Sequence, residues 1–405
     1  MNSSRIPLYR VQGTHYQCAQ QIGSLTREAI RHRIADDFAY LSPLFAFVQS
    51  DYGLKLHRDF IEAIRKYYPW YWDEIRGLAD GSEIPIEQLL VLNFLNETRT
   101  AYRLLEEKKK DQEPENETGE KGCTTVLINR TDSKTLSLLH NEDHSSSLFM
   151  TGYLVEADIQ SSPYENNQRQ SPDEKFIAYC YAGAIPGNAF GVNVHGFACS
   201  LNGLYPNFIA HGRLPRQIVN RALLSAKNED DLDNILYSSP VAYGFSVNGG
   251  FFTQPNHLFN YELGPNLKLE NENYLSKCWI VAKENIQDIQ ADFEVMKNYF
   301  VHYNHYERLA DVIVQQKALE STYSRWQRGQ ELGEISTIQD AICLLGDNQN
   351  EAFPIFRVPN ATDSNSVTLC TVHINFLTSE LSIYQCNPKE NNQPSLIYNL
   401  GDLFQ

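Results

Sequence analysis

The first ~100 residues place apolar side chains at the three- and four-residue spacing that is typical of amphipathic helices. One such stretch covers residues 13–40, a second covers residues 56–81, and a third opens at residues 84–87. The glycine at the end of the second stretch is a helix-ending signal. In the first stretch the apolar positions are Ile22, Leu25, Ile30, Ile34 and Phe38. We therefore expect the front of the chain to be mostly helical.

The pattern changes after Gly122 to short runs rich in β-branched and aromatic residues, separated by Gly, Asn, Asp and Ser. Such runs predict strands, and several predict hairpins with polar turns at residues 129–133 and 193–196. The runs are TTVLINR, KTLSLLHNED, GYLVEADI, KFIAYCYAGA, AFGVNVHGFACSLNG and AYGFSVNGGFF, with a closing hairpin in SVTLCTVHINFLTSELSIYQC whose turn lies near Thr378. Further helical stretches are predicted at residues 213–236, 286–319 and 335–346. Strands packed with helices favour an α+β fold built of layers.

A charged segment separates these two parts of the chain. After Leu105 the sequence runs through EEKKKDQEPENETGEK and then changes abruptly to GCTTVLI. We predict an exposed loop over residues 104–122, which divides a helical segment (1–122) from a strand-rich body (123–405). A loop of this length is uncommon inside a compact domain unless it is functional or disordered. Cys123, which stands where this loop becomes a buried strand, is therefore a candidate functional residue.

The bulk charge excludes some classes of function. A net charge of −16 and an isoelectric point of about 5.1 argue against nucleic-acid or anionic-membrane binding, because phosphate contacts need clustered Lys and Arg. The N-terminus lacks the apolar run of a signal peptide, and no stretch is long enough to cross a bilayer. The eight cysteines are scattered without a CxxC pair, so we expect reduced thiols in a cytoplasmic protein.

Cleavage of the bond between Gly122 and Cys123 would place two catalytic groups on one residue. Cys123 would then carry a thiol with a reference pKa of about 8.5 and an α-amine with a pKa of about 8. The amine can accept the thiol proton and later donate it to a leaving group. The thiol could also make the cut itself, by attacking the Gly122 carbonyl to form a thioester that water hydrolyses. Glycine suits that position because it has no Cβ and leaves its carbonyl open.

Other polar residues also have structural explanations from the sequence alone. Asp143 is equally consistent with a turn, and Asn304 with a helix cap. Arg325 and Arg328 lie three residues apart and are consistent with a solvent-facing helix surface. Asn202, followed by glycine, is by itself a turn signal.

Rival chemistries have weaker signatures. His140 and His144 are four residues apart, but their motif is not H-E-x-x-H, and we expect its place at a strand end to keep the two imidazoles off a common face. The H-x-E found here lacks the P-C-x-x-C of zinc deaminases. A papain-like cysteine signature and a glycine-rich phosphate loop are also missing from the sequence. We therefore expect no metal and no cofactor.

A set of motifs along the chain occurs in the same order as in one known family. GCTT (122–125) is followed by a hairpin and by HNED (140–143). The further motifs are GVNVHGFACSLNGLYP, RQIVNRALLSAKNEDD, HYNHYERL, STYSRWQRGQEL and VTLCTVHINFLTSELSIY, with GTHYQCAQQIGSLTREAI and WDEIRGLADGSEIPIEQLLVLNFLNE in front. Over nearly its whole length the chain resembles the penicillin acyltransferase family of N-terminal nucleophile hydrolases. The resemblance implies a four-layered αββα fold, self-cleavage before Cys123, and two chains (1–122 and 123–405) that stay associated.

The resemblance also implies roles by position. Cys123 would be the nucleophile and, through its α-amine, the base. Asp143 would hold that amine, and Asn304 would donate a hydrogen bond to the oxyanion of the tetrahedral intermediate. Either arginine of the Ser-Arg-x-x-Arg helix would steady the thiol or a substrate carboxylate, and the sequence does not separate the two. The two arginine candidates are Arg325 and Arg328. Asn141 and Asn202 would be further polar groups that line the site.

The front segment looks closest to animal β-alanyl-amine hydrolases, which cut N-β-alanyl-dopamine and carcinine. We therefore expect hydrolysis of a small linear amide through a thioester at Cys123, with bile-salt amides, penicillin-type amides and N-acyl amino acids left open. One alternative is an acyltransferase that moves an acyl group from a thioester to an amine. A second alternative is an uncleaved binding relative without catalysis. The expected partners are the small-molecule substrate and the second self-derived chain, and a homodimer is compatible with the sequence.

Overall fold

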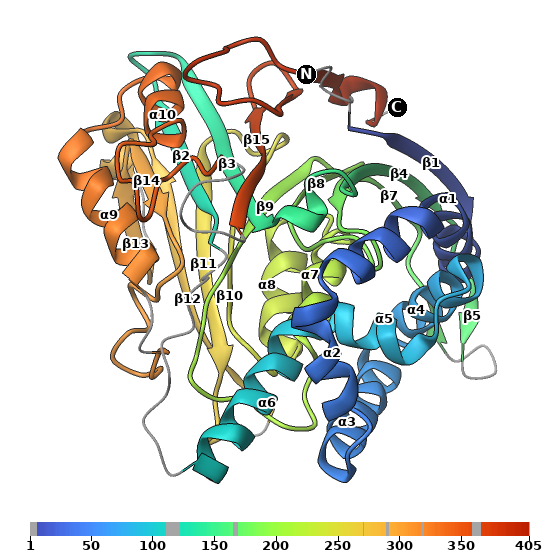
Figure 1. Cartoon of the computed structure of the whole chain (residues 1–405). Helices are drawn as coiled ribbons and strands as arrows, with labels where there is room; N and C mark the ends of the chain where they lie inside the picture. The colour runs from blue at the N-terminus through green and yellow to red at the C-terminus, as the bar shows by residue number, and fades with distance from the viewer. Residues whose placement is uncertain are drawn as a thin grey trace.

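Two β-sheets lie face to face in this protein, with helices on both outer sides (Figure 1). The computed structural model describes residues 6–110, 122–164, 169–269, 271–288, 291–316, 320–358 and 366–404. The α+β class and the four-layered αββα arrangement implied by the resemblance are confirmed. The helices are α1 (His15–Asp36), α2 (Phe38–Phe47), α3 (Asp51–Tyr67), α4 (Pro69–Ser82), α5 (Ile86–Asn93), α6 (Leu95–Lys110), α7 (Arg216–Leu223), α8 (Glu229–Ser238), α9 (Glu320–Leu332) and α10 (Ile338–Leu345). Among the described residues, no helix is both long and apolar enough to cross a membrane.

The larger sheet has the strand order β1-β4-β7-β8-β9-β10-β11-β12-β13, and the smaller one has the order β14-β2-β3-β15-β16-β17. The strands of the larger sheet are β1 (Leu8–Gly13), β4 (Tyr153–Ile159), β7 (Glu174–Cys180), β8 (Phe190–Asn193), β9 (Phe197–Gly203), β10 (Phe245–Phe251), β11 (His257–Pro265), β12 (Asn273–Val281) and β13 (Glu294–Lys297). Those of the smaller sheet are β2 (Thr124–Arg130), β3 (Thr135–Ser145), β14 (Tyr299–His302), β15 (Ser366–Asn375), β16 (Glu380–Tyr384) and β17 (Leu396–Asn399). A short ribbon pairs β5 (Pro163–Tyr164) with β6 (Arg169–Gln170). The predicted hairpins β2–β3, β8–β9 and β15–β16 are confirmed.

Alternation along β2 and β3 explains the layers. Successive residues of a strand face opposite sides of its sheet. Leu127 and Leu138 accordingly belong to the core between the two sheets. Val126, Ile128 and Leu139 belong to a second core, which they share with α10. The hairpin that follows Cys123 is therefore buried on both faces.

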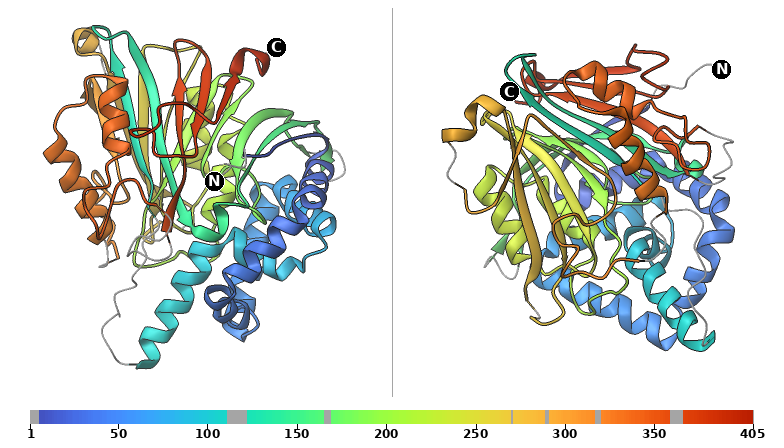
Figure 2. Two further views of the ribbon diagram at one scale, coloured as in Figure 1. Left: turned by 45° about the horizontal axis from the view of Figure 1, so that its top comes forward. Right: turned by 90° about the vertical axis from the view of Figure 1, so that its left-hand side faces the viewer.

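The N-terminal segment is built into the fold. Strand β1 pairs in parallel with β4, with Leu8 opposite Leu154, so the expectation of a mostly helical front misses one strand. Helices α1 to α6 cover the outer face of the larger sheet (Figure 2) and share one continuous core with its strands. Helix α6 runs through Lys110, so the prediction of a loop over residues 104–122 is wrong for its first part. Strong helix formers and the Arg103–Glu107 ion pair at 2.6 Å favour the helix there. The rest of that loop, residues 111–121, lies outside the described residues.

A buried ion cluster fastens this segment to the body. Arg221 on α7 donates to both Glu74 carboxylate oxygens on α4, at 2.7 and 3.0 Å, and its Nη1 lies 2.6 Å from Glu174 Oε2 on β7. His15 Nδ1 on α1 lies 2.7 Å from Glu74 Oε1. Burial alone would raise the pKa of Glu74, but Arg221 and His15 outweigh it and lower that pKa. The charges therefore hold the two parts together without an unpaired carboxylate.

Two helix predictions need correction. Residues 286–319 were expected to be helical, but this part of the chain forms β13 and β14 and then an irregular segment through residue 316. The burial of YFVH (299–302) alternates, and β14 finds a distant antiparallel partner in β2, with His302 opposite Thr125. The stretch 213–236 is two helices, because Asn228 starts α8 by accepting a hydrogen bond from the Asp231 amide.

We predict that Arg221→Met lowers the free energy of unfolding by about 3–5 kcal/mol, because the buried carboxylates of Glu74 and Glu174 lose the guanidinium between them. The measurement is urea unfolding in a Cys123→Ala background, which is expected to keep the chain in one piece. The matched control is Arg31→Met, which removes an exposed pair with Glu28 and is expected to cost less than about 1 kcal/mol. Equal losses in the two variants would contradict the structural importance of the cluster.

Candidate active site

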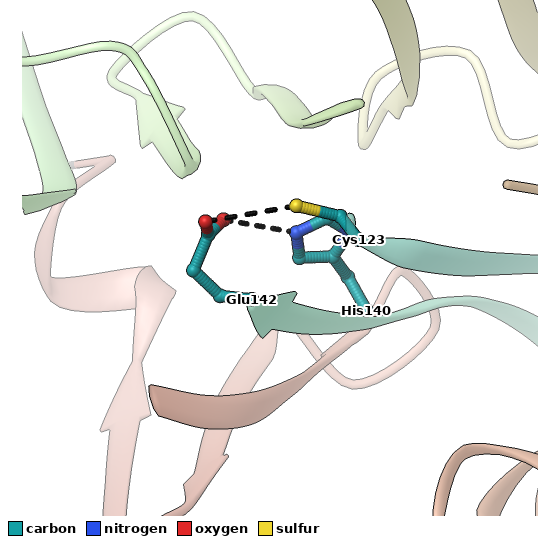
Figure 3. Close-up of side chains that lie close together, drawn as sticks. All are labelled: Cys123, His140 and Glu142. Carbon is teal, nitrogen blue, oxygen red and sulfur yellow. Dashed lines mark hydrogen bonds and ion pairs between the residues drawn. The ribbon is translucent and has the colours of Figure 1, made fainter. Parts of the chain in front are cut away.

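Cys123 lies immediately before β2, with its side chain 9% exposed, and lines a cavity of about 50 Å³. That volume holds only a few water molecules. The cavity is lined by both parts of the chain, including Tyr40, Asn96 and Arg99 from the N-terminal segment. The Cys123 thiol donates to Glu142 Oε1 at 3.6 Å (Figure 3). The predicted nucleophile is thus placed in a small enclosed space with a carboxylate as its hydrogen-bond acceptor.

The surroundings of Cys123 keep its thiol protonated. Burial raises the pKa of this thiol well above its ordinary value, and the negative charges of Glu142 and Asp143 raise it further. The Arg325 guanidinium acts in the opposite direction but does not prevail. Since the thiolate is the nucleophile, any attack by this sulfur needs a base that takes its proton.

Asp143 is buried on the opposite face of β3 from Glu142. Its Oδ1 accepts a hydrogen bond from Thr368 Oγ1 at 2.7 Å, and its Oδ2 lies 3.5 Å from Arg357 Nε. Oδ2 has no hydrogen-bond partner among the described residues. Burial raises the pKa of Asp143 to about 6, although Arg357 and Arg325 lower it. A second cation beside Oδ2, such as an ammonium group, would find an open acceptor there.

Gly122, Asn304 and Arg325 are packed tightly together. Arg325 is fully buried; its Nη1 donates to the Cys123 carbonyl oxygen and to Thr124 Oγ1, each at 2.9 Å. Its Nη2 donates to Asn304 Oδ1 at 2.8 Å. A Cβ on Gly122 would lie 2.3 Å from Arg325 Nη2 and 2.5 Å from Asn304 Oδ1, so a larger residue would have to displace both side chains. Asn304 Nδ2, the predicted oxyanion donor, donates to the Gly203 carbonyl oxygen at 2.9 Å in this structure.

The other predicted residues divide into those near Cys123 and those away from it. Asn202 on β9 lines the same cavity. Asn141 is not among the residues that line the cavity; its Nδ2 donates to the carbonyl oxygens of Leu345 and Ile355, and its Oδ1 accepts from Thr371. Its contacts are those of a structural residue that ties β3 to the loops around α10.

Arg328 is not brought to the cluster either. Its guanidinium binds both carboxylate oxygens of Asp347 at 3.0 Å and also pairs with Glu331. Of the two arginines on α9, the geometry therefore favours Arg325 as the functional one.

The sequence analysis did not predict Glu142 as a partner of the thiol, and it weighed His140 only as a metal ligand. The expectation that the strand would keep His140 and His144 off a common face is wrong, because residues at even spacing share a face of a strand. His140 Nε2 lies 3.1 Å from Glu142 Oε2, and the His144 ring lies 4.8 Å from the ring of Tyr181, which donates to Glu142 Oε1. The i, i+2 spacing of His140 and Glu142 on a predicted strand was the available signal.

Ligand atoms of Cys123, His140 and Glu142 all lie within 4.8 Å of one another, a spacing that a metal ion could use. Each atom is, however, already engaged in a hydrogen bond or ion pair within the cluster. The geometry of this cluster is that of groups sharing protons.

We predict that Arg325→Lys reduces the yield of cleaved chain per unit time about 100-fold, because lysine cannot reach the Cys123 carbonyl and Asn304 at once. Arg328→Lys is the matched control on the same helix and is expected to stay within about twofold of the unchanged protein. Both rates are read from the appearance of the 123–405 fragment by intact mass. An equal effect of the two substitutions would contradict the assignment of Arg325.

Comparisons with known proteins place the chain in a family. Residues 129–390 match the family model described as acyl-coenzyme A:6-aminopenicillanic acid acyl-transferase. The matched range includes Asp143, Asn202, Asn304 and Arg325 but begins after Cys123. A β-alanyl-dopamine/carcinine hydrolase of Drosophila melanogaster is 25% identical over 388 residues, which are 95% of this chain and 94% of that protein.

Among solved structures, a mutant conjugated bile acid hydrolase from Clostridium perfringens aligns with a TM-score of 0.40 and 10% identity, over 70% of this chain and 94% of that one. The family match covers well over half of the sequence and runs through both sheets and the helices on each side of them. The chain belongs to the acyl-coenzyme A:6-aminopenicillanic acid acyl-transferase family.

Proposed function

We propose that this protein cleaves its own chain between Gly122 and Cys123 and then uses Cys123 as an N-terminal nucleophile to hydrolyse small linear amides. The observation that carries the proposal is the junction itself. Its glycine is held against the Asn304 and Arg325 side chains, and its thiol donates to a carboxylate in a small cavity. Cleavage at this bond needs a sulfur held close to its own peptide bond and a group that can take the thiol proton, and the junction offers both.

After cleavage the new α-amine of Cys123 would serve as the base. The amine takes the thiol proton, the sulfur attacks the substrate carbonyl, and the same proton passes to the leaving amine. Water then hydrolyses the thioester and restores the thiol. Asp143, whose Oδ2 is without a hydrogen-bond partner among the described residues, is positioned to hold the α-ammonium form. Asn304 would supply a donor to the oxyanion once its amide is free of the Gly203 carbonyl, a contribution of about 3 kcal/mol.

At the level of reaction class, the chain is an amide-bond hydrolase of this family. For the substrate, we propose an N-β-alanyl amine, which is the chemistry in the name of the Drosophila relative. The cavity supports this proposal, because the carboxylates of Glu142 and Asp143 suit a primary ammonium and the rings of Tyr40, Tyr181 and Tyr205 suit an aromatic amine.

Acyl transfer is the second candidate, since the family model takes its name from an acyl-transferase. The two reactions share the thioester at Cys123 and differ in whether water or an amine accepts the acyl group. Adding a second amine during turnover separates them, because a transferase forms the new amide and a hydrolase releases the free acid. A non-catalytic binding relative would leave the chain uncut and insensitive to loss of Cys123.

We predict that denaturing intact mass spectrometry finds two chains, residues 1–122 and 123–405, in place of the single 46.4 kDa chain. Cys123→Ala is expected to give only the full-length chain, because no nucleophile attacks Gly122. The two chains of the unchanged protein are expected to elute together in native size exclusion, held by the core and ion cluster of the N-terminal segment.

The cleaved protein is then assayed with N-β-alanyl-dopamine and β-alanyl-histamine, with Cys123→Ala as the blank. The same two fragments from Cys123→Ala would mean that an outside protease makes the cut. Equal amide turnover by that variant would reject Cys123 as the nucleophile.

We also predict that Gly122→Ala slows self-cleavage at least about 10-fold, because the added methyl displaces the Arg325 and Asn304 side chains, whose contacts hold the Cys123 carbonyl beside the cleaved bond. Gly401→Ala is the control, since its nearest neighbour would be the movable end of Asn399 at 3.0 Å. The rate is measured as the fraction of 123–405 fragment over time. An unchanged rate in Gly122→Ala would contradict the tight packing of the junction.

A further inference from the structure

In the intact chain the α-amine of Cys123 does not yet exist, because its nitrogen is part of the peptide bond to Gly122. The base proposed for amide hydrolysis is therefore missing when the chain cuts itself, and the buried thiol must lose its proton to another group. This inference rests on the proposed function and concerns that first cut.

Glu142 is the acceptor that the structure offers to the thiol. Its Oε1 accepts from Cys123 Sγ at 3.6 Å and from the Tyr181 hydroxyl. Its Oε2 lies 3.1 Å from His140 Nε2. The carboxylate is 1% exposed, and both of its oxygens are occupied by protein groups (Figure 3). A proton that leaves Cys123 along its existing hydrogen bond arrives on Glu142.

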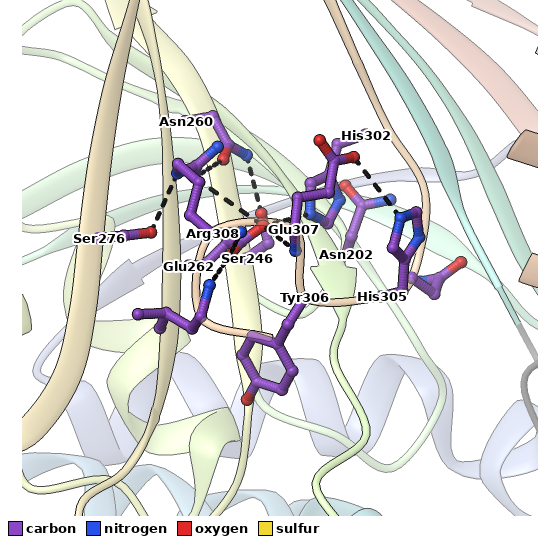
Figure 4. Close-up of polar contacts among 12 residues, drawn as sticks. Asn202, Ser246, Asn260, Glu262, Ser276, His302, His305, Tyr306, Glu307 and Arg308 are labelled. Atoms are coloured by element: carbon purple, nitrogen blue, oxygen red, sulfur yellow. Dashed lines mark hydrogen bonds and ion pairs between the residues drawn. The ribbon is translucent and has the colours of Figure 1, made fainter. Parts of the chain in front are cut away.

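A chain of hydrogen bonds runs from Arg308 to His140, and the donor and acceptor of each bond in it are fixed. Arg308, which can only donate, binds Asn260 Oδ1 (Figure 4). Asn260 Nδ2 must then be the donor to Asn248 Oδ1, at 2.7 Å, and Asn248 Nδ2 the donor to Asn202 Oδ1, also at 2.7 Å. The cationic end of the chain thus orients three buried amides in turn.

The orientation of Asn202 decides the tautomer of His140. Asn202 Oδ1 lies 2.8 Å from Thr125 Oγ1, and because a carbonyl oxygen only accepts, the Thr125 hydroxyl must donate to it. Thr125 Oγ1 also lies 2.7 Å from His140 Nδ1, which must then carry a hydrogen and donate to Thr125. His140 Nε2 and Glu142 Oε2 are left to share one proton, and the pair can accept a second one on Glu142.

We propose that the Glu142–His140 pair, oriented from Arg308 through the buried amides, is the base that activates Cys123 for self-cleavage. The Cys123 S–H bond breaks and its proton passes to Glu142 as sulfur bonds to the Gly122 carbonyl carbon, whose π electrons move to oxygen. The carbonyl re-forms as the C–N bond to Cys123 breaks, and Glu142 returns the proton to that nitrogen. The products are a Gly122 thioester and a free α-amine, and water hydrolyses the thioester to the Gly122 carboxylate and the Cys123 thiol.

Several other titratable and charged groups face this pair from the elements packed around it. They are Asp143 and His144 on β3, Tyr179 on β7 with Tyr181 beyond its end, Cys370 on β15 and Arg325 on α9. Burial raises the pKa of the two tyrosines and of Cys370 well above their ordinary values, so they stay neutral at neutral pH. Asp143 is the nearest other carboxylate and therefore the competing candidate for the base, so its variant is compared with that of Glu142.

The test is the pH dependence of self-cleavage in the full-length chain, followed by intact mass from pH 5 to 9 in about equal steps. In the unchanged protein the rate is expected to rise with pH and then level off. Glu142→Gln is expected to cleave about 100-fold more slowly, with a rate that keeps rising in proportion to hydroxide. Asp143→Asn tests the competing carboxylate on the same strand; its rate is not a control, because Asp143 belongs to the proposed site, but its profile is expected to keep levelling off.

The proposal would be overturned if Glu142→Gln cleaved at the unchanged rate, or cleaved slowly but with the pH profile of the unchanged protein. It would also be overturned if the rate of Asp143→Asn, and not that of Glu142→Gln, no longer levelled off with pH. Cleavage that a metal chelator stops would overturn it as well. If Glu142→Gln does not fold by circular dichroism, Glu142→Asp replaces it and is expected to keep the levelling profile at a lower rate; a profile without levelling would reject the carboxylate as base. Failure of the proposed function is distinct, because then the unchanged protein stays intact or Cys123→Ala is cut.

Discussion

The antiparallel pairing of β2 with β3 is the constraint on which the rest of the site depends. It sets Thr124 opposite Asn141 and Thr125 opposite His140. Cys123, one residue before Thr124, thereby meets Glu142, one residue after Asn141, and its thiol donates to the Glu142 carboxylate. A shift of one residue would turn every one of these side chains to the other face of the sheet. The tight four-residue connection at residues 131–134 and the cores on both faces make such a shift costly.

This pairing gives the two faces of β3 different chemistry. Between the sheets, His140 and Glu142 join a chain of neutral amides that ends at a cation, which suits the movement of a proton. On the other face, Asp143 lies with Arg357, and Arg325 binds the junction itself, which suits the holding of charge. The alternation of the strand therefore gives the two carboxylates different hydrogen-bond partners.

The N-terminal segment contributes more than the residues that precede a cleavage site. It supplies one strand of the larger sheet, one half of a buried ion cluster and part of the cavity wall through Tyr40 and Arg99. Such contacts do not depend on the peptide bond before Cys123. A protein cut at that bond would therefore keep both its fold and the wall of its cavity, which is what an enzyme assembled from two self-derived chains requires.

The local features of this protein follow from its sequence alone. Alternating runs with polar turns determined the hairpins, helical spacing determined the front helices, and a glycine before a cysteine at the start of a buried strand marked the site. The tertiary structure alone decided between Arg325 and Arg328, since which guanidinium meets the strand depends on how α9 is rotated against the sheet. It also made β14 a strand rather than a helix, because its partner β2 is distant in sequence, and it turned Asn141 to a structural role while Glu142 met the thiol. Periodicity is a local property of the chain, whereas the partner of each side chain is set by segments that only folding brings together.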